Sequence, residues 1–348
     1  MAKERRVDPL EYPLRDKIPE PGTTHEVADG VHWIRMPMPG RLDHINVWLL
    51  RDGDGWTIVD TGINSEDIQG WWEAIFEKYL DGRPVKRVFA THLHNDHTGL
   101  AGWLARRWDC ELWMSQAEFF MCRVMAADGP ADVPEDAIRF YKRAGFDKRW
   151  IEIYRSRFGK FGSAISQLPV GYRRVLDGDV IPIDGRDWHV AVGRGHSPEH
   201  ICLYSPDAGV MISGDQVLPR ITPNVSVNPS EPHANPLKFW LNSCRALQET
   251  IPNDLLVLPA HQDPFHGLHR RLVDLVDFHE TGIEKLLALC NEPKRAVDVF
   301  PALFKSEIND YMFFPATGES IAHIHYAMDQ GLLVEERDAE GVAWFRQA

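Results

Sequence analysis

The stretch THLHNDHTG, residues 91–99, constrains this chain more than any other part of its sequence, because it places three histidines and an aspartate within six consecutive positions after an apolar run. Residues two apart on an extended loop point the same way, so His92 and His94 can hold one ion. Asp96 and His97 then project elsewhere, towards a second ion. Imidazole and carboxylate are the ligands that borderline divalent metals such as zinc prefer. The motif therefore predicts a metal-binding loop.

Short strands and helices alternate on both sides of this motif. Before and next to it, β-branched and aromatic residues predict strands over 31–37, 45–52, 56–60 and 85–90, with a serine-capped helix over 65–80. The motif then lies on a strand-to-helix loop, where α/β proteins usually carry their chemistry. Further strands are predicted over 173–179, 188–192, 201–205, 209–215 and 255–261, with a helix near 235–250. Strand and helix content recurs in similar order, which predicts two packed halves, each a sheet with helices.

Three more candidate ligands stand at the ends of predicted strands. They are His196 in GRGHSPEH, Asp215 in MISGDQ and His261 in LPAHQDP. A shared Asp215 carboxylate would hold two ions a few ångströms apart, and such a pair can polarise a carbonyl or phosphoryl oxygen while lowering the pKa of bound water to roughly 7. Between the two halves, residues 115–168 are mostly helical in composition and contain no ligand cluster. We expect them to form an insertion that covers a site.

The composition narrows the functional classes. A length of 348 residues suits one large domain plus an appendage, and 51 acidic against 38 basic residues give a net charge of -13, which disfavours nucleic acid as a partner. No stretch of about eighteen apolar residues and no signal-type leader is present, so no membrane contact is expected. The 5 cysteines are scattered and never form CxxC, which favours a reducing cytoplasm.

The motifs together resemble those of the metallo-β-lactamase superfamily. The matching segments are THLHNDHTG, GHSPEH, SGDQ, PAH and the VDTG of residues 59–62, and they extend over roughly residues 30 to 280. The resemblance implies an α/β (α+β) fold, a four-layer αββα sandwich with a dinuclear metal site at one edge. It implies that the first metal binds His92, His94 and His196, that the second binds Asp96, His97 and His261, and that Asp215 bridges them.

The resemblance also implies a reaction, hydrolysis by metal-bound hydroxide, with Asp96 accepting or relaying a proton. The cofactors would be two divalent metal ions, zinc first, with iron or manganese as alternatives. Because a bridging aspartate is typical of thioesterases, lactonases and nucleases of the superfamily, the expected substrate is a small molecule, an acyl thioester or related ester or lactone. A nuclease or phosphodiesterase and a mononuclear iron dioxygenase relative are the alternatives. Asp263 stands where glyoxalase II has a tyrosine, which disfavours glutathione thioesters.

Three residues are expected to assist the ligands or the substrate. Asp60, in VDTG, matches an aspartate that orients the metal loop in the family, and a plain turn cap is the alternative. His200 is expected either to support a ligand or to be an ordinary strand residue. Arg220 lies in a Pro- and Asn-rich segment after Asp215, and it is expected either to meet a substrate carboxylate or phosphate or to form a surface salt bridge.

The C-terminal region resembles a small winged-helix appendage of one branch of the superfamily. Residues 291–304 and 318–331 predict two helices, and LLVEE with VAWFR predicts a two-stranded wing. From Glu284 onward there are eleven acidic and six basic residues, which disfavours phosphate contact. We expect a packing or homodimerisation role, with a catalytic domain over 1–281, the insertion at about 115–168, and a C-terminal domain over 282–348.

Overall fold

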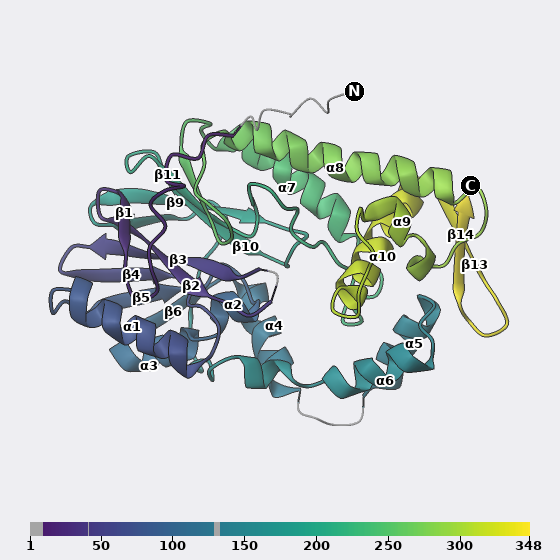
Figure 1. Cartoon of the computed structure of the whole chain (residues 1–348), viewed down its shortest axis with the longest axis horizontal. Coiled ribbons are helices and arrows are strands. Elements are labelled where there is room, and N and C mark those ends of the chain that lie inside the picture. Colours follow the sequence, from purple (N-terminus) through teal and green to yellow (C-terminus); the bar gives the residue numbers. More distant parts are fainter. Residues whose placement is uncertain (1–9, 41, 129–132) are drawn as a thin grey trace.

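The computed structural model describes residues 10–40, 42–128 and 133–348. Two β-sheets pack face to face, and helices cover the outer face of each (Figure 1). The four-layer αββα sandwich predicted above is therefore confirmed. Residues 1–9 of the predicted catalytic domain and 129–132 of the predicted insertion lie outside the described residues. None of the helices in the described part is long and apolar enough to cross a membrane.

The first sheet has seven strands in sequential order. They are β1 (His25–Ala28), β2 (Val31–Pro37), β3 (His44–Asp52), β4 (Gly55–Val59), β5 (Val85–Phe89), β6 (Glu111–Met114) and β7 (Arg173–Arg174). Strands β1 to β4 pair antiparallel, whereas β4 to β7 pair parallel. Helices α1 (Glu66–Tyr79) and α3 (Ala101–Trp108) cover its outer face, and the Ser65 hydroxyl caps α1 by accepting from the Ile68 amide, as the sequence predicts.

The second sheet has five strands in the order β12-β11-β10-β9-β8. Their bounds are β8 (Val180–Ile183), β9 (Arg186–Gly193), β10 (His200–Ser205), β11 (Val210–Gly214) and β12 (Leu256–Pro259). Only β11 and β12 pair parallel. Helices α7 (Pro236–Thr250) and α8 (Leu268–Leu289) cover the outer face (Figure 1). The sequence analysis did not predict α8, the longest helix of the described chain.

Alternating side chains of the first sheet enter two separate cores. Trp33 and Trp48 join the core between the sheets, whereas the neighbouring Ile34 and Val47 join the core under α1 and α3. Because successive side chains of a strand point to opposite faces and both faces are covered, these strands are mostly apolar on both faces. Because side chains on both faces of these strands are buried, the strands hold the loops at their ends in fixed positions along one edge of the sandwich.

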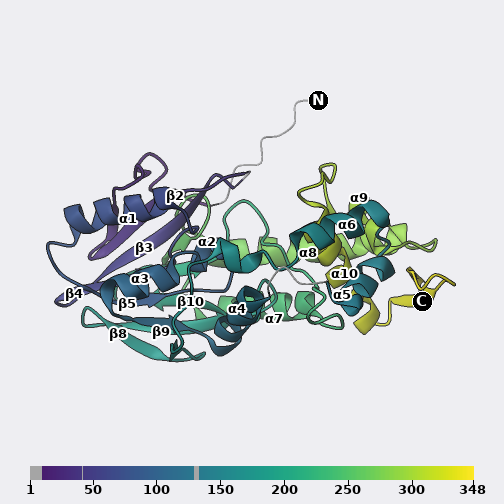
Figure 2. The same ribbon diagram turned by 90° about the horizontal axis from the view of Figure 1, so that it is seen from below.

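The predicted insertion contains helices α4 (Gln116–Ala127), α5 (Glu135–Arg143) and α6 (Lys148–Arg157). Figure 2 shows α5 and α6 beside the C-terminal elements, far from the α1 end of the sandwich. The Trp150 ring of α6 stacks on Phe313 with 3.6 Å between ring centroids, and Arg143 pairs with Glu335. The 116–157 helices therefore connect the sandwich to the C-terminal region.

The C-terminal region differs from the prediction in its first helix. Instead of a helix over 291–304, a 3-10 turn at Ala296–Asp298 is followed by the short α9 (Phe300–Leu303). Pro293 and Pro301 lack the amide hydrogen that a continuous helix needs, and each constrains the residue before it, so a helix through both is broken.

The rest of the C-terminal region forms where the sequence predicts it. Helix α10 (Phe313–Asp329) begins five residues before the predicted start, and β13 (Leu333–Arg337) pairs antiparallel with β14 (Ala343–Gln347). The winged-helix relationship of these elements stays a prediction. The predicted boundary at 281/282 lies inside α8, which is continuous.

Candidate metal centre

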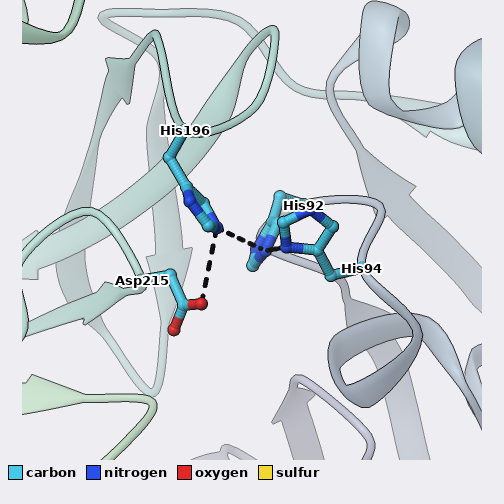
Figure 3. A group of neighbouring side chains, drawn as sticks. All are labelled: His92, His94, His196 and Asp215. Atoms are coloured by element: carbon cyan, nitrogen blue, oxygen red, sulfur yellow. Dashed lines mark hydrogen bonds and ion pairs between the residues drawn. The ribbon is translucent and has the colours of Figure 1, made fainter. Parts of the chain in front are cut away.

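All seven predicted ligands lie at strand ends, on one edge of the sandwich. They follow β5 (His92, His94, Asp96, His97), β9 (His196), β11 (Asp215) and β12 (His261). The short helix α2 (Asn95–Thr98) begins directly after His94. Asp96 and His97 therefore point in a different direction from His92 and His94. Figure 3 shows His196 and Asp215 of the second sheet facing His92 and His94 of the first. The two halves of the sandwich thus each supply ligands to one site.

The first group comprises His92, His94, His196 and Asp215, whose ligand atoms all lie within 4.8 Å of one another. His92 Nε2 lies 2.8 Å from His94 Nδ1 and 3.3 Å from His196 Nε2 (Figure 3). Asp215 Oδ2 lies 3.4 Å from His196 Nε2. Three imidazoles and one carboxylate that face a common point form a donor set suited to a borderline divalent ion.

The second group comprises Asp96, His97 and His261. Asp96 Oδ2 lies 3.3 Å from His261 Nε2 and 3.6 Å from His97 Nε2. The other carboxylate oxygen of Asp215, Oδ1, lies 3.4 Å from His261 Nε2 and 3.7 Å from His97 Nε2. The two oxygens of Asp215 therefore face the two groups separately.

Two buried atoms beside the second group have no hydrogen-bond partner within the described residues, namely His97 Nε2 and the Oδ1 atom of Asp215 that faces this group. An unpaired buried polar atom is costly, and native structures leave few of them. Both atoms point at the space that Asp96 and His261 also face, so a cation there would satisfy them together. The residues present fit a divalent metal ion at this position.

Hydrogen bonds on the opposite ring nitrogens fix the orientation of three histidines. His97 Nδ1 donates to Asp60 Oδ2 at 2.7 Å, while the Nδ1 atoms of His196 and His261 donate to backbone oxygens at 2.8 Å, those of Asn224 and His44. A proton held on Nδ1 leaves the lone pair on Nε2, which is the atom that faces the site in all three.

Asp60 is hydrogen-bonded to the motif loop and to one of its histidines. Its two oxygens accept hydrogen bonds from the Thr91 amide (2.8 Å) and the Thr91 hydroxyl (2.9 Å), in addition to the bond from His97. Its backbone φ of 62° lies in the left-handed region, where aspartate and asparagine are among the few tolerated non-glycine residues. Asp60 therefore fixes the loop and one ligand ring rather than acting as a plain turn cap.

Burial and neighbouring charges set the protonation states. Burial, reinforced by the adjacent His196, lowers the pKa of His94 to about 3, and burial also holds the pKa of His92 well below 6.5. Burial alone would lower the pKa of His97 too, but Asp60, Asp96 and Asp215 together raise it to about 10. His92 and His94 are thus neutral and ready to bind, whereas a metal ion in the second group would replace a proton on His97.

His200 supports Asp215 from behind. It is fully buried, its Nε2 accepts a hydrogen bond from the Asp215 amide at 3.0 Å, and its ring stacks on that of His92. The backbone of Gly214 lies so close that a Cβ there would be 2.5 Å from the His200 ring. His200 therefore contacts two candidate ligands, Asp215 and His92.

Arg220 belongs to a charged group next to His261. Its guanidinium lies 3.0 Å from one oxygen of Asp263, and Arg35 lies 3.1 Å from the other. The Arg220 side chain is 35% exposed, and its amide donates to Gln262 Oε1. Two guanidinium groups around one carboxylate leave a net positive charge beside the second group, so the salt bridge does not remove the attraction for an anion.

Sequence reasoning missed Glu118, a residue of α4 whose carboxylate joins both metal loops. Glu118 Oε2 accepts from the Leu93 amide (2.9 Å), and Oε1 accepts from the Ser197 hydroxyl (2.6 Å) and the Glu199 amide (2.8 Å). The residue is fully buried, and burial raises the pKa of its carboxyl. Glu199 in turn accepts from the Ala117 amide at the start of α4, which explains an acid at a position that the motif alone leaves unaccounted for.

The family of the chain follows from direct comparison. Residues 40–278 match the Metallo-beta-lactamase superfamily, and residues 283–348 match a Metallo-beta-lactamase-like, C-terminal domain. The chain belongs to the metallo-beta-lactamase superfamily. The resemblance stated from the motifs is confirmed, and the His/Asp cluster is the metal-binding candidate of a metallo-hydrolase fold.

Similar proteins match between 69% and 97% of the chain. The crystal structure of a beta-lactamase domain protein from Burkholderia ambifaria is 42% identical, has a TM-score of 0.90, and covers 97% of this chain and 98% of that one. The probable metallo-hydrolase YqjP of Bacillus subtilis is 25% identical over 317 residues, which cover 84% of this chain and 90% of YqjP. The acyl-coenzyme A thioesterase MBLAC2 of Homo sapiens is 24% identical over 265 residues, which cover 69% of this chain and 80% of MBLAC2.

Proposed function

We propose that this protein is a dinuclear metal-dependent hydrolase of acyl thioesters or related small esters. The observation that carries the proposal is the position of Asp215, whose Oδ2 faces the first group at 3.4 Å while its Oδ1 faces the second group at 3.4 and 3.7 Å. A carboxylate placed in this way is suited to bridge two ions. His92, His94 and His196 would hold one, and Asp96, His97 and His261 the other.

Divalent ions bound there supply Lewis acidity and a water nucleophile at neutral pH. The chain's own residues prepare the rest. Asp96 is the candidate proton acceptor: burial opposes its charge, but His97 and His261 lower the pKa of its carboxyl, so it is ionised at neutral pH. Its side chain is 14% exposed, more than either imidazole beside it, which leaves it accessible to a proton from the site.

The substrate class is inferred from a group of charged side chains close to the ligands in sequence and structure, and from a relative. The group formed by Arg35, Asp263 and Arg220 carries a net positive charge next to His261. This charge favours a substrate with a carboxylate or phosphate, such as an acyl group on a phosphate-bearing thiol carrier. The relative MBLAC2, named an acyl-coenzyme A thioesterase, supports the same class. Zinc is the first candidate for both ions, since imidazole and carboxylate suit it; iron or manganese are the alternatives.

The test combines metal analysis with a substrate panel. We expect two metal ions per purified chain and turnover of acyl-coenzyme A thioesters above that of lactones, phosphodiesters and RNA. Asp96→Asn keeps the size of the side chain but removes its charge and basicity, so turnover should fall by about two to four orders of magnitude. His32→Gln, a distant and partly buried change, is the control and should leave turnover unchanged.

Other results would identify a different function. Near-normal turnover by Asp96→Asn would contradict the role assigned to this carboxylate. Preferred cleavage of RNA or phosphodiesters would favour the nuclease alternative. A single iron per chain, with no hydrolysis of any substrate in the panel, would favour a mononuclear iron enzyme.

A further inference from the structure

The first half of α10 is hydrogen-bonded to the segment 224–227, which lies directly behind the first metal group. The side-chain amide of Asn224 donates to Glu319 Oε2 at 2.9 Å and to the Pro315 oxygen at 3.2 Å. The Val227 amide donates to the Gly318 oxygen at 3.1 Å. The contact joins two segments about ninety positions apart in the sequence, and it holds the loop through the Asn224 side chain and the Val227 backbone amide.

Gly318 is required for this contact. A Cβ at position 318 would lie 2.6 Å from the Ser226 hydroxyl, closer than Cβ atoms approach other atoms, and 3.1 Å from the Val227 oxygen, which is tighter than most such contacts. The Ser226 hydroxyl itself donates to the Pro315 oxygen at 3.3 Å. The glycine therefore permits the helix and the loop backbone to meet without a side chain between them.

The same loop residue reaches a metal ligand. The backbone oxygen of Asn224 accepts the hydrogen bond from His196 Nδ1 at 2.8 Å, while its side chain binds Glu319. Asn224 thus connects the Glu319 carboxyl group to the imidazole ring of His196, whose Nε2 faces the first metal group. Displacing Asn224 would release the ring orientation and the tautomer of His196 together.

Glu319 is an ionisable residue in a buried position. It is 7% exposed, and a buried carboxyl is unfavourable unless its partners repay the loss of water. Its neighbours are also buried and polar: His323 Nδ1 donates to the Glu319 backbone oxygen, and His323 Nε2 lies 3.2 Å from His279 Nδ1 of α8. These contacts tie α10 to α8, and a carboxylate oxygen of Glu319 also lies within 4.8 Å of ring nitrogens of His279 and His323. Among the described residues, the Asn224 side chain is the group that donates a hydrogen bond to the Glu319 carboxyl.

We propose that Glu319 is a positioning residue for the first metal site, and that through Asn224 the C-terminal helix α10 holds His196 in its ligand orientation. The inference rests on the proposed function, because it assumes that His196 binds a metal. It gives the C-terminal region a part in metal binding, although that region supplies no ligand of its own.

The test measures metal affinity in Glu319 variants of the full chain. Glu319→Leu removes the acceptor of the Asn224 amide at similar volume, and Glu319→Gln retains an acceptor oxygen. In zinc competition against a chromophoric chelator, we expect the first site of Glu319→Leu to lose about 10- to 100-fold in affinity, the usual loss for a group that orients a metal ligand. The second site should keep its affinity, and Glu319→Gln should stay within about threefold of the wild type at both sites. Cobalt substitution gives an independent readout through the absorption of the ion coordinated by His196.

Two further variants separate positioning from folding. Ser320→Ala alters the next residue of α10, a buried hydroxyl without a hydrogen-bond partner among the described residues, and should change neither site. Asn224→Ala keeps the backbone oxygen that binds His196 but removes the link to α10. It should reproduce the loss seen in Glu319→Leu, and it decides the matter if Glu319→Leu does not fold.

The outcomes distinguish this inference from the function on which it rests. Wild-type affinity at the first site in both Glu319→Leu and Asn224→Ala would overturn the inference alone. Equal losses at both sites in Glu319→Gln and Glu319→Leu would also overturn it, since they would indicate a general structural effect. A wild-type protein that binds no zinc or cobalt would overturn the proposed function and this inference with it.

Discussion

At the residue scale, Asp60 combines a backbone conformation and a set of contacts that few residue types can provide together. Its φ of 62° favours glycine, asparagine or aspartate over most other residues, and its carboxylate binds both Thr91 and His97. Asp60→Asn changes the charge while it keeps the backbone unstrained. We expect affinity for the second metal to fall by about 10- to 100-fold, because His97 loses the carboxylate that fixes its ring and its tautomer.

The measurement is a zinc titration that resolves the two sites. The first site should change less, since the ring of His196 is held by Asn224 and not by Asp60. Asp184→Asn is another change at a left-handed aspartate. Asp184 precedes β9, whereas the ligand His196 follows the other end of that strand, so this change should leave both affinities unaltered. Unchanged affinity at the second site in Asp60→Asn would show that the 2.7 Å contact with His97 does not matter for binding.

The residues that face the metal site were predictable, and those that hold them in place mostly were not. The motif of residues 91–99 identifies its own ligands because they are local in sequence, and His196, Asp215 and His261 follow from strand ends and the family resemblance. Glu118 and Asn224 carry no such signal. A glutamate in the first turn of a helix is common on solvated surfaces, and nothing local shows that these side chains reach loops far away in the sequence.

At the element scale, α4 is attached to both metal loops by a single carboxylate. Glu118 accepts three hydrogen bonds, from Leu93, Ser197 and Glu199, and all three donors are inside the protein or nearly so. Even the conservative change Glu118→Gln should destabilise the protein. The amide oxygen of glutamine can accept hydrogen bonds at one of the two oxygen positions, but its NH₂ group then faces a donor at the other position. We expect this change to lower the free energy of unfolding by on the order of 2–4 kcal/mol.

Urea unfolding of the metal-free protein measures this effect without a contribution from bound ions. Glu111→Gln, an exposed carboxylate on β6, is the matched control and should change the unfolding free energy by less than about 0.5 kcal/mol. Should Glu118→Gln be as stable as Glu111→Gln, the three hydrogen bonds do not hold the loops as described.

Local patterns predicted the elements unequally well. Strands β2, β3 and β4 were predicted within one residue at each end, because runs of β-branched and aromatic residues end at clear turns. The helix predicted over 291–304 is mostly absent, since two prolines outweigh its apolar spacing. Helix α8 was missed although it has 22 residues and a buried stripe that includes Leu272, Leu275 and His279. Its continuity through 281/282 also places the predicted domain boundary within one rigid element.

At the scale of the whole molecule, polar groups buried between α8, α10 and the 224–227 loop connect the C-terminal region to the sandwich. The pKa of Glu319 shows the cost of that connection: burial, opposed only in part by the Asn224 hydrogen bond, raises it to about 7. The titratable groups beside it, His279 and His323, are neutral because burial holds the pKa of His279 well below 6.5 and that of His323 at about 4. Between pH 5 and 8, Glu319 is therefore the group of this cluster that titrates.

The sign of the resulting pH dependence follows from linkage. Between pH 4.5 and 7 the folded protein keeps a proton on Glu319 that the unfolded chain has released, so the free energy of unfolding falls as the pH rises through this window and stays lower above it. The gap between the two pKa values corresponds to roughly 3 kcal/mol. The glutamine of Glu319→Gln cannot titrate. The free energy of unfolding of the wild type minus that of the variant should therefore decrease by up to about 3 kcal/mol from pH 5 to pH 8. Denaturation of both proteins at matched pH values measures this difference, because the contributions of the other titrating groups largely cancel in it. If the free energy of unfolding changes with pH in the same way for both proteins, Glu319 is not a buried carboxyl with a raised pKa.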